Sequence, residues 1–126
     1  MYGDASGSAQ QTTGMSDYEL VREYFMANSR VTVDYRVPKS NPPVRERVNL
    51  VNRLFLSAAG QVAVQVDPKC KELIKDLEQV CYKADSMVID KDRDRARTHV
   101  SDALGYLMWQ ECRPQPTIGE RGEALI

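Results

Sequence analysis

The chain has 126 residues, of which 42% are hydrophobic and 28% charged, a composition typical of one globular domain. Its 17 Lys and Arg residues are matched by 18 Asp and Glu residues, and the net charge of −1 excludes a surface that binds nucleic acid through overall charge. No apolar stretch approaches the roughly 20 residues that span a membrane. Three cysteines without a CxxC pair argue against a disulfide framework or a zinc knuckle and favour a reducing cytoplasm.

The first part of the chain is predicted to contain two helices and a strand. Residues 1–16 have the Gly, Ser, Gln and Thr content of a disordered leader. Ser16 with Glu19 forms a capping-box pattern, which predicts a helix that ends near residue 28. Residues 30–37 alternate apolar and polar side chains, as a strand does. A second helix is expected after Asn41, its predicted cap, and the two prolines that follow. Its buried stripe would consist of Val44, Val48, Val51 and Phe55.

The middle of the chain is predicted to contain a second strand and a third helix. Residues 61–66 alternate again and predict a second strand, and Asp67-Pro68 is a helix-start signal. Cys70 and Cys81 lie on the apolar stripe of that third helix, so we interpret both as small core residues. The rest of the stripe is Leu73, Ile74 and Leu77. Residues 91–97 alternate in charge, a pattern typical of solvated surface.

The last helix is predicted from about residue 95 to residue 111. Its core stripe would be Val100, Ala103, Leu104, Leu107 and Met108. An adjoining face, set by helical spacing, carries His99, Asp102, Tyr106 and Trp109. Asp102 in the middle of a helix and beside an apolar stripe is unfavourable. It is either a solvent-facing carboxylate or an oxygen ligand aimed into a cleft for a divalent metal ion.

Asp4 is the second candidate metal ligand. It stands in Gly-Asp-Ala-Ser-Gly at residues 3–7, where an Asp at the end of a short strand next to glycine would open into a cleft. The same five residues also fit an ordinary turn. Asp4 and Asp102 are 98 positions apart, and we predict that the fold brings them close enough to share one ion.

Several short motifs in fixed order resemble the nuclease domain of tailed-phage terminase large subunits. Each motif is modest, and their order over residues 3–106 makes the resemblance specific. The motifs are GDASG at 3–7, TTG at 12–14, SDY at 16–18, NPPVRERV at 41–48, NLVN at 49–52, DPKCKEL at 67–73 and THVSDALGY at 98–106.

The resemblance implies an α/β fold, an RNase H-like mixed sheet flanked by helices. It also implies that the sheet is incomplete on its N-terminal side, because the family's first acid lies on a strand upstream of Asp4. We therefore expect a partial nuclease domain over residues 1–113 and a tail over 114–126. The unpaired sheet edge around Tyr2 would allow self-association.

The resemblance also implies a site and a reaction. In this family three acids hold Mg²⁺ or Mn²⁺ and cut concatemeric double-stranded DNA by two-metal phosphodiester hydrolysis. Asp4 matches the second acid and Asp102 the third, and His99, one turn before Asp102, would orient it or approach the metal. Three arginines are candidates for contacts with DNA phosphates. They are Arg45, Arg47 and Arg53.

Two departures from the family pattern limit the expected activity. The first acid is missing, and no GxxxxGK[ST] phosphate loop of a packaging ATPase is present. We expect little or no cleavage by this chain alone, with a non-catalytic phage-assembly module or prophage remnant as the alternative. The implied partners are double-stranded DNA, the packaging ATPase domain and a portal or small terminase, in the cytoplasm of a host bacterium.

Overall fold

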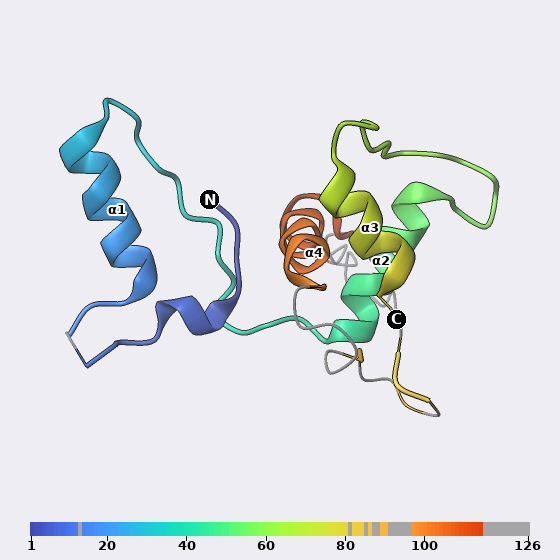
Figure 1. Ribbon diagram of the computed structural model, residues 1–126, viewed down its shortest axis with the longest axis horizontal. Coiled ribbons are helices and arrows are strands. Elements are labelled where there is room, and N and C mark those ends of the chain that lie inside the picture. The colour runs from blue at the N-terminus through green and yellow to red at the C-terminus, as the bar shows by residue number, and fades with distance from the viewer. Residues whose placement is uncertain (13, 81, 85, 87–88, 91–96, 115–126) are drawn as a thin grey trace, which may run out of the picture.

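The computed structural model describes residues 1–12, 14–80, 82–84, 86, 89–90 and 97–114 (Figure 1). Its elements are the 3₁₀ helix η1 (Ala5–Ser8) and the helices α1 (Asp17–Asn28), α2 (Val44–Phe55), α3 (Lys71–Gln79) and α4 (His99–Cys112). Helices α2 and α3 both pack against α4, whereas α1 contacts η1. Figure 1 accordingly shows an N-terminal arm of η1 and α1 beside a body of three helices.

The predicted RNase H-like mixed sheet is wrong for this structure. Within the described ranges no sheet forms, and the strand-like pairing there is confined to two isolated bridges. These bridges join Gln10 to Ser16 and Tyr82 to Ile89. The sheet edge that was expected to support self-association is absent as well, because residues 1–4 lead into η1 rather than into a strand.

The segments that alternate in sequence are extended without a ladder partner in the described part of the chain. In residues 31–37 the side chains of Val33, Tyr35 and Val37 are half-buried, whereas the residues between them are exposed. The amide of Arg36 donates one hydrogen bond, of 2.8 Å, to the carbonyl oxygen of Met1. Alternation therefore indicates which side of an extended segment faces inward, and this side can be covered without a neighbouring strand.

The helix predictions hold better because their signals are local. Ser16 and Glu19 form the predicted capping box of α1, with the Ser16 amide 2.7 Å from a Glu19 carboxylate oxygen. Helix α2 covers the predicted residues. Helix α3 begins only after Cys70, and α4 begins at His99 rather than near residue 95. No helix in the described residues has the length and apolarity needed to cross a bilayer.

The buried faces differ from the predicted stripes. On α2 the buried residues are Arg47, Leu50 and Val51, while Val44 is exposed. Buried hydrophobic residues elsewhere in the described chain are Ile89 and Met108. Cys70 is exposed, so its prediction as a core residue is wrong, and Cys81 lies outside the described residues. The α2 face is rotated toward Arg47 because α4 offers this side chain charged and aromatic partners, which are described below.

Two predicted features fall largely outside the described residues. They are the charge-alternating segment, of which residues 91–96 are not described, and the tail, of which 115–126 are not described. Arg97, the last residue of the charged segment, lies at the body of the molecule rather than free in solvent. It donates to a Glu72 carboxylate oxygen at 3.2 Å and to an Asp76 carboxylate oxygen at 3.4 Å.

Candidate functional site

The Asp4 carboxylate accepts hydrogen bonds from three donors, one backbone amide and two side chains. Its Oδ1 accepts hydrogen bonds from the Ser6 amide at 2.7 Å and from the Asn41 amide group at 2.8 Å. Its Oδ2 accepts a hydrogen bond from the Tyr106 hydroxyl at 2.9 Å. The donors from Asn41 and Ser6 hold the pKa of the Asp4 carboxyl well below its usual range, since they stabilise the charged form. Asp4 is therefore a fixed anion at the point where the arm meets α4.

Asp102 is paired with an arginine from α2. Arg47 Nη2 lies 2.7 Å from Asp102 Oδ1, and Arg47 Nη1 donates to the Asp102 carbonyl oxygen at 3.1 Å. Only 4% of Arg47 is exposed, and Asp102 is half-buried. A planar guanidinium that bonds both the carboxylate and the main chain of one residue fixes the position of that residue. The carboxylate predicted as the third acid thus lies against a resident positive charge.

Tyr106 connects the two predicted acids. It lies one turn after Asp102 on α4, its hydroxyl donates to Asp4, and the Arg47 guanidinium carbon is 4.6 Å from the centre of its ring. Burial, the hydrogen bond to Asp4 and the negative charges of Asp4 and Asp102 raise the pKa of Tyr106 to about 12. The structure therefore joins Asp4 and Asp102 through Tyr106 and Arg47.

A cavity of about 280 Å³ lies beside Asp102, between α2, α3 and α4. Its lining includes Arg47, Asp102, Gly105, Asp76 and Ile89. Asp76, a residue the sequence did not point to, is 1% exposed and accepts hydrogen bonds from the amides of Val100 and Ser101, both at 3.1 Å. It therefore caps the N-terminus of α4 and is committed to holding that helix.

The other predicted site residues are distributed differently. His99 is the first residue of α4 and is exposed. Arg45 and Arg53 are exposed on α2, whereas Arg47 is buried against Asp102. The predicted DNA-contacting arginines therefore divide into two that face solvent and one that belongs to the network of Asp4 and Asp102.

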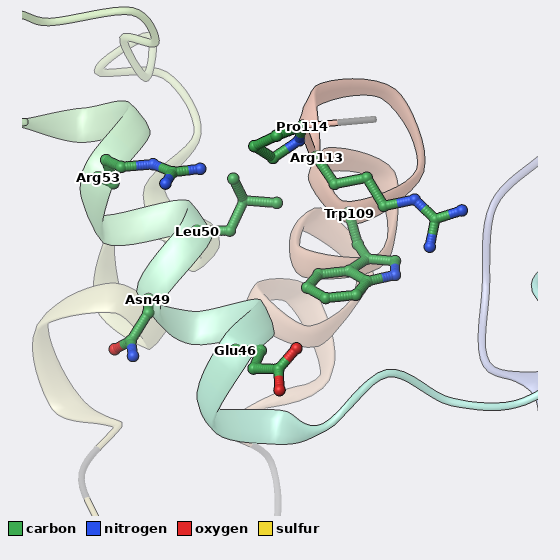
Figure 2. A pocket seen from close by; sticks show the side chains of 7 residues that line it. All are labelled: Glu46, Asn49, Leu50, Arg53, Trp109, Arg113 and Pro114. Carbon is green, nitrogen blue, oxygen red and sulfur yellow. The ribbon is translucent and has the colours of Figure 1, made fainter. Parts of the chain in front are cut away.

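A second, larger hollow of about 680 Å³ separates α2 from the end of α4 (Figure 2). Figure 2 shows Arg53 on the α2 side and Trp109 with Arg113 on the α4 side. The Arg113 guanidinium carbon is 5.8 Å from the centre of the Trp109 ring. The remaining lining residues are Glu46, Asn49, Leu50 and Pro114. An indole beside one guanidinium group, with a second across the hollow, suits contact with a sugar-phosphate backbone or an exposed base.

The network supplies the right kind of ligand for a hard divalent ion, in part. Carboxylate oxygens are the usual protein ligands of Mg²⁺. The Asp4 carboxylate accepts a hydrogen bond from Tyr106, and the Asp102 carboxylate is bound by Arg47. In the part of the chain that the structure describes, however, no group of three or more His, Cys, Asp or Glu side chains could hold a metal ion. The described residues thus fit a contribution to one ion and do not fit a complete two-ion centre.

Three residues of this network were missed or misassigned from sequence. Asn41 was predicted to cap α2, but its side chain bonds Asp4 and accepts a hydrogen bond from the Ala5 amide at 2.8 Å. Arg47 was predicted to contact DNA phosphates, but it is buried against Asp102. Gly105 was read only as part of a motif, although a Gly inside a helix costs about 1 kcal/mol relative to Ala and so indicates a close approach at that position.

Comparison with protein families matches residues 2–111 to the terminase RNaseH-like domain. Comparison with curated proteins and with solved structures gave no match. The family match spans more than half of the chain and includes Asp4, Arg47, Asp102 and Tyr106. The chain therefore belongs to the family of terminase RNaseH-like domains.

Proposed function

We propose that this chain contributes two carboxylates, Asp4 and Asp102, to a metal-dependent endonuclease site that cuts double-stranded DNA during viral genome packaging. The observation that carries the proposal is the joining of these acids, 98 positions apart, through Tyr106 and Arg47 within a terminase RNaseH-like domain. When bound there, Mg²⁺ or Mn²⁺ would supply an activated water and stabilise the leaving oxygen. The protein would act in the cytoplasm of the host, together with a packaging ATPase domain and a portal or small terminase.

The side chains of this site have separate tasks in the proposal. Asp4 and Asp102 provide negative charge and oxygen ligands. Asn41 and Tyr106 orient the Asp4 carboxylate through hydrogen bonds of 2.8 and 2.9 Å. Orientation by fixed donors lowers the cost of ordering a ligand when the ion binds. His99, exposed one turn before Asp102, remains a candidate for a further contact with the ion.

The proposed DNA contacts lie on the exposed arginines. Arg53 and Arg113 border the hollow of Figure 2. The half-buried Trp109 also lines it. Arg45 is exposed near the start of the same helix as Arg53. These contacts would recognise the phosphate backbone and not the base sequence.

Plasmid nicking in the presence of Mn²⁺ tests the proposed reaction. We expect weak nicking by the 126-residue chain, because the described residues lack a three-carboxylate group. Asp102→Asn and Asp4→Asn each remove one charge and should reduce the nicking rate at least tenfold, a loss equivalent to about 1.4 kcal/mol.

Asp67→Asn is the matched control for these substitutions. Asp67 is exposed and its Oδ1 accepts a hydrogen bond from the Lys69 amide at 2.8 Å, which an Asn side chain can also accept. The control should therefore nick at the wild-type rate. Nicking that survives Asp102→Asn unchanged would place the cleavage site elsewhere.

A non-catalytic assembly module is the second candidate function. The observation in its favour is that eleven large hydrophobic side chains of the described residues are exposed, against four hydrophobic residues that are buried. A contiguous exposed apolar patch is typical of a surface that packs against another protein, and four of these side chains, Leu20, Tyr24, Phe25 and Met26, lie on α1. Absence of Mn²⁺-dependent nicking together with retained helical structure would favour this module.

A further inference from the structure

We infer that Arg47 is the built-in counter-ion of the candidate metal site and competes with a divalent cation for Asp102. The inference rests on the proposed function and adds to it the residue that sets the affinity for metal. Arg47 Nη2 is 2.7 Å from Asp102 Oδ1, one of the two carboxylate oxygens through which Asp102 would bind a metal ion. One guanidinium therefore occupies the place of a cation beside this carboxylate.

The Arg47 guanidinium and a divalent cation would both be positively charged groups at the Asp102 carboxylate. Arg47 also lies over Tyr106, which bonds Asp4, so its charge acts on both predicted acids. A divalent ion near Asp102 would be repelled by a guanidinium held within hydrogen-bond distance of the same oxygen. Binding of the ion to this oxygen would compete with the contact that Arg47 makes.

The buried Arg47 guanidinium does not form all of its hydrogen bonds in this structure. Its Nε is buried and has no hydrogen-bond partner among the described residues. A buried donor without an acceptor destabilises the arrangement by about 1–3 kcal/mol. This cost lowers the free energy needed to move the guanidinium away from Asp102 when a better cation arrives.

Gly105 makes room for the guanidinium. A Cβ atom at this position would lie 2.5 Å from Arg47 Nη1 and 3.2 Å from its Cδ. Since Nη1 is the far end of a flexible side chain, an Ala at this position would displace the guanidinium and leave the helix backbone intact. The absence of a side chain at 105 is therefore what allows Arg47 to reach Asp102.

Titration of Mn²⁺ by calorimetry into the wild type and variants of the full chain tests the inference. Arg47→Gln removes the positive charge and should tighten Mn²⁺ binding roughly tenfold. Gly105→Ala should also tighten it, through displacement of the same charge. Arg47→Lys retains the charge and should bind Mn²⁺ as the wild type does.

Two further proteins make the result specific. Arg30→Gln makes the same charge change at an exposed position between α1 and α2 and should leave the affinity for Mn²⁺ within twofold of the wild type. In the double variant Arg47→Gln/Gly105→Ala the second substitution should add nothing, because its effect acts through Arg47. Circular dichroism shows whether each variant retains its helices, and Gly105→Ala provides the test if Arg47→Gln does not fold.

The outcomes separate the inference from the proposed function. Wild-type Mn²⁺ binding that is lost in Asp102→Asn, but is no tighter in Arg47→Gln and Gly105→Ala, overturns the inference and leaves the proposed function standing. An equal gain in Arg30→Gln would also overturn it, because net charge alone would then explain the change. Failure of every folded variant to bind Mn²⁺ overturns the proposed function and the inference with it.

Discussion

At the scale of single residues, Tyr106 is a side chain whose pKa depends on both predicted acids. Its hydroxyl donates to Asp4, and burial is the first cause of its raised pKa, followed by that hydrogen bond. Because the folded-state pKa of Tyr106 is about 12 and the ordinary value is 10, the protonated hydroxyl stabilises the fold below pH 10. This stabilisation is lost as the pH rises from about 10 to about 12.

Asp4→Asn should lower the pKa of Tyr106 toward 10, since it removes a negative charge and the charged acceptor. The measurement is the ultraviolet titration of tyrosinate, with the curve of Tyr106→Phe subtracted to isolate Tyr106 from the other tyrosines. Asp67→Asn should leave the curve unchanged. An unaltered Tyr106 pKa in Asp4→Asn would show that the hydrogen bond is not formed in solution.

Asp102 was singled out because of its predicted position in the middle of a helix, and the structure places it elsewhere in the helix. It was judged unfavourable as a mid-helix Asp, but α4 begins at His99, so Asp102 lies in the first turn, where a negative charge is favoured. Helical spacing places Arg47 beside the apolar Leu50 and Val51, but its burial was not predicted, because arginine side chains are mostly exposed. Its burial depends on Gly105 of another helix, and this is a tertiary relation that helical spacing does not contain.

At the scale of elements, the start of α4 depends on a residue from α3. Thr98 precedes the helix with a positive φ of 91°, in the left-handed region, and makes no side-chain cap. Asp76 provides the missing acceptor, with one carboxylate oxygen 3.1 Å from the amides of both Val100 and Ser101. The position of Asp102, one residue farther along, thus depends on a cap that is supplied from 22 residues upstream of Thr98.

Asp76→Ala should destabilise the fold by roughly 3 kcal/mol, because it leaves two helix N–H groups and the Arg97 guanidinium without their buried acceptor. Asp76→Asn keeps one oxygen acceptor and should cost less. Urea unfolding followed by circular dichroism gives both values. Glu78→Ala, at an exposed position of the same helix, is the control, and equal losses in Glu78→Ala and Asp76→Ala would contradict the capping role.

The elements themselves were predictable where the signal was local. The capping box of Ser16 and Glu19 marked the start of α1, and the two prolines after Asn41 marked α2. Residues 31–37 were predicted as a strand, but a strand needs a partner that alternation cannot identify. Half-burial of Val33, Tyr35 and Val37 satisfies the alternation without one.

At the scale of the whole molecule, the arm and the body are held together by a few polar contacts. Besides the hydrogen bond between Asp4 and Tyr106, the Tyr2 hydroxyl and the Arg36 guanidinium both donate to Glu111, at 2.9 and 2.8 Å. Helix α1 contains no buried residue, although Leu20, Tyr24, Phe25 and Met26 are large and apolar. The stability of α1 therefore owes little to tertiary packing.

Hydrogen exchange should divide the molecule in two. An isolated helix of 12 residues is marginal in water, so we expect the amides of α1 to exchange far faster than those around Gly105 and Met108, which are buried in α4. Mass-spectrometric exchange at neutral pH provides the comparison within one sample. Equal protection of both helices would mean that α1 is covered in solution, as the assembly-module function requires.

The close approach of Arg47 to Gly105 has a consequence for how this sequence can vary. A methyl group at position 105 and an arginine at position 47 cannot both keep their present places, since 2.5 Å separates a Cβ from Nη1. The two positions are therefore expected to co-vary. A larger residue at 105 requires a shorter or differently directed side chain at 47. Among related chains, a side chain at 105 would mark a site whose acid at 102 has a different counter-ion.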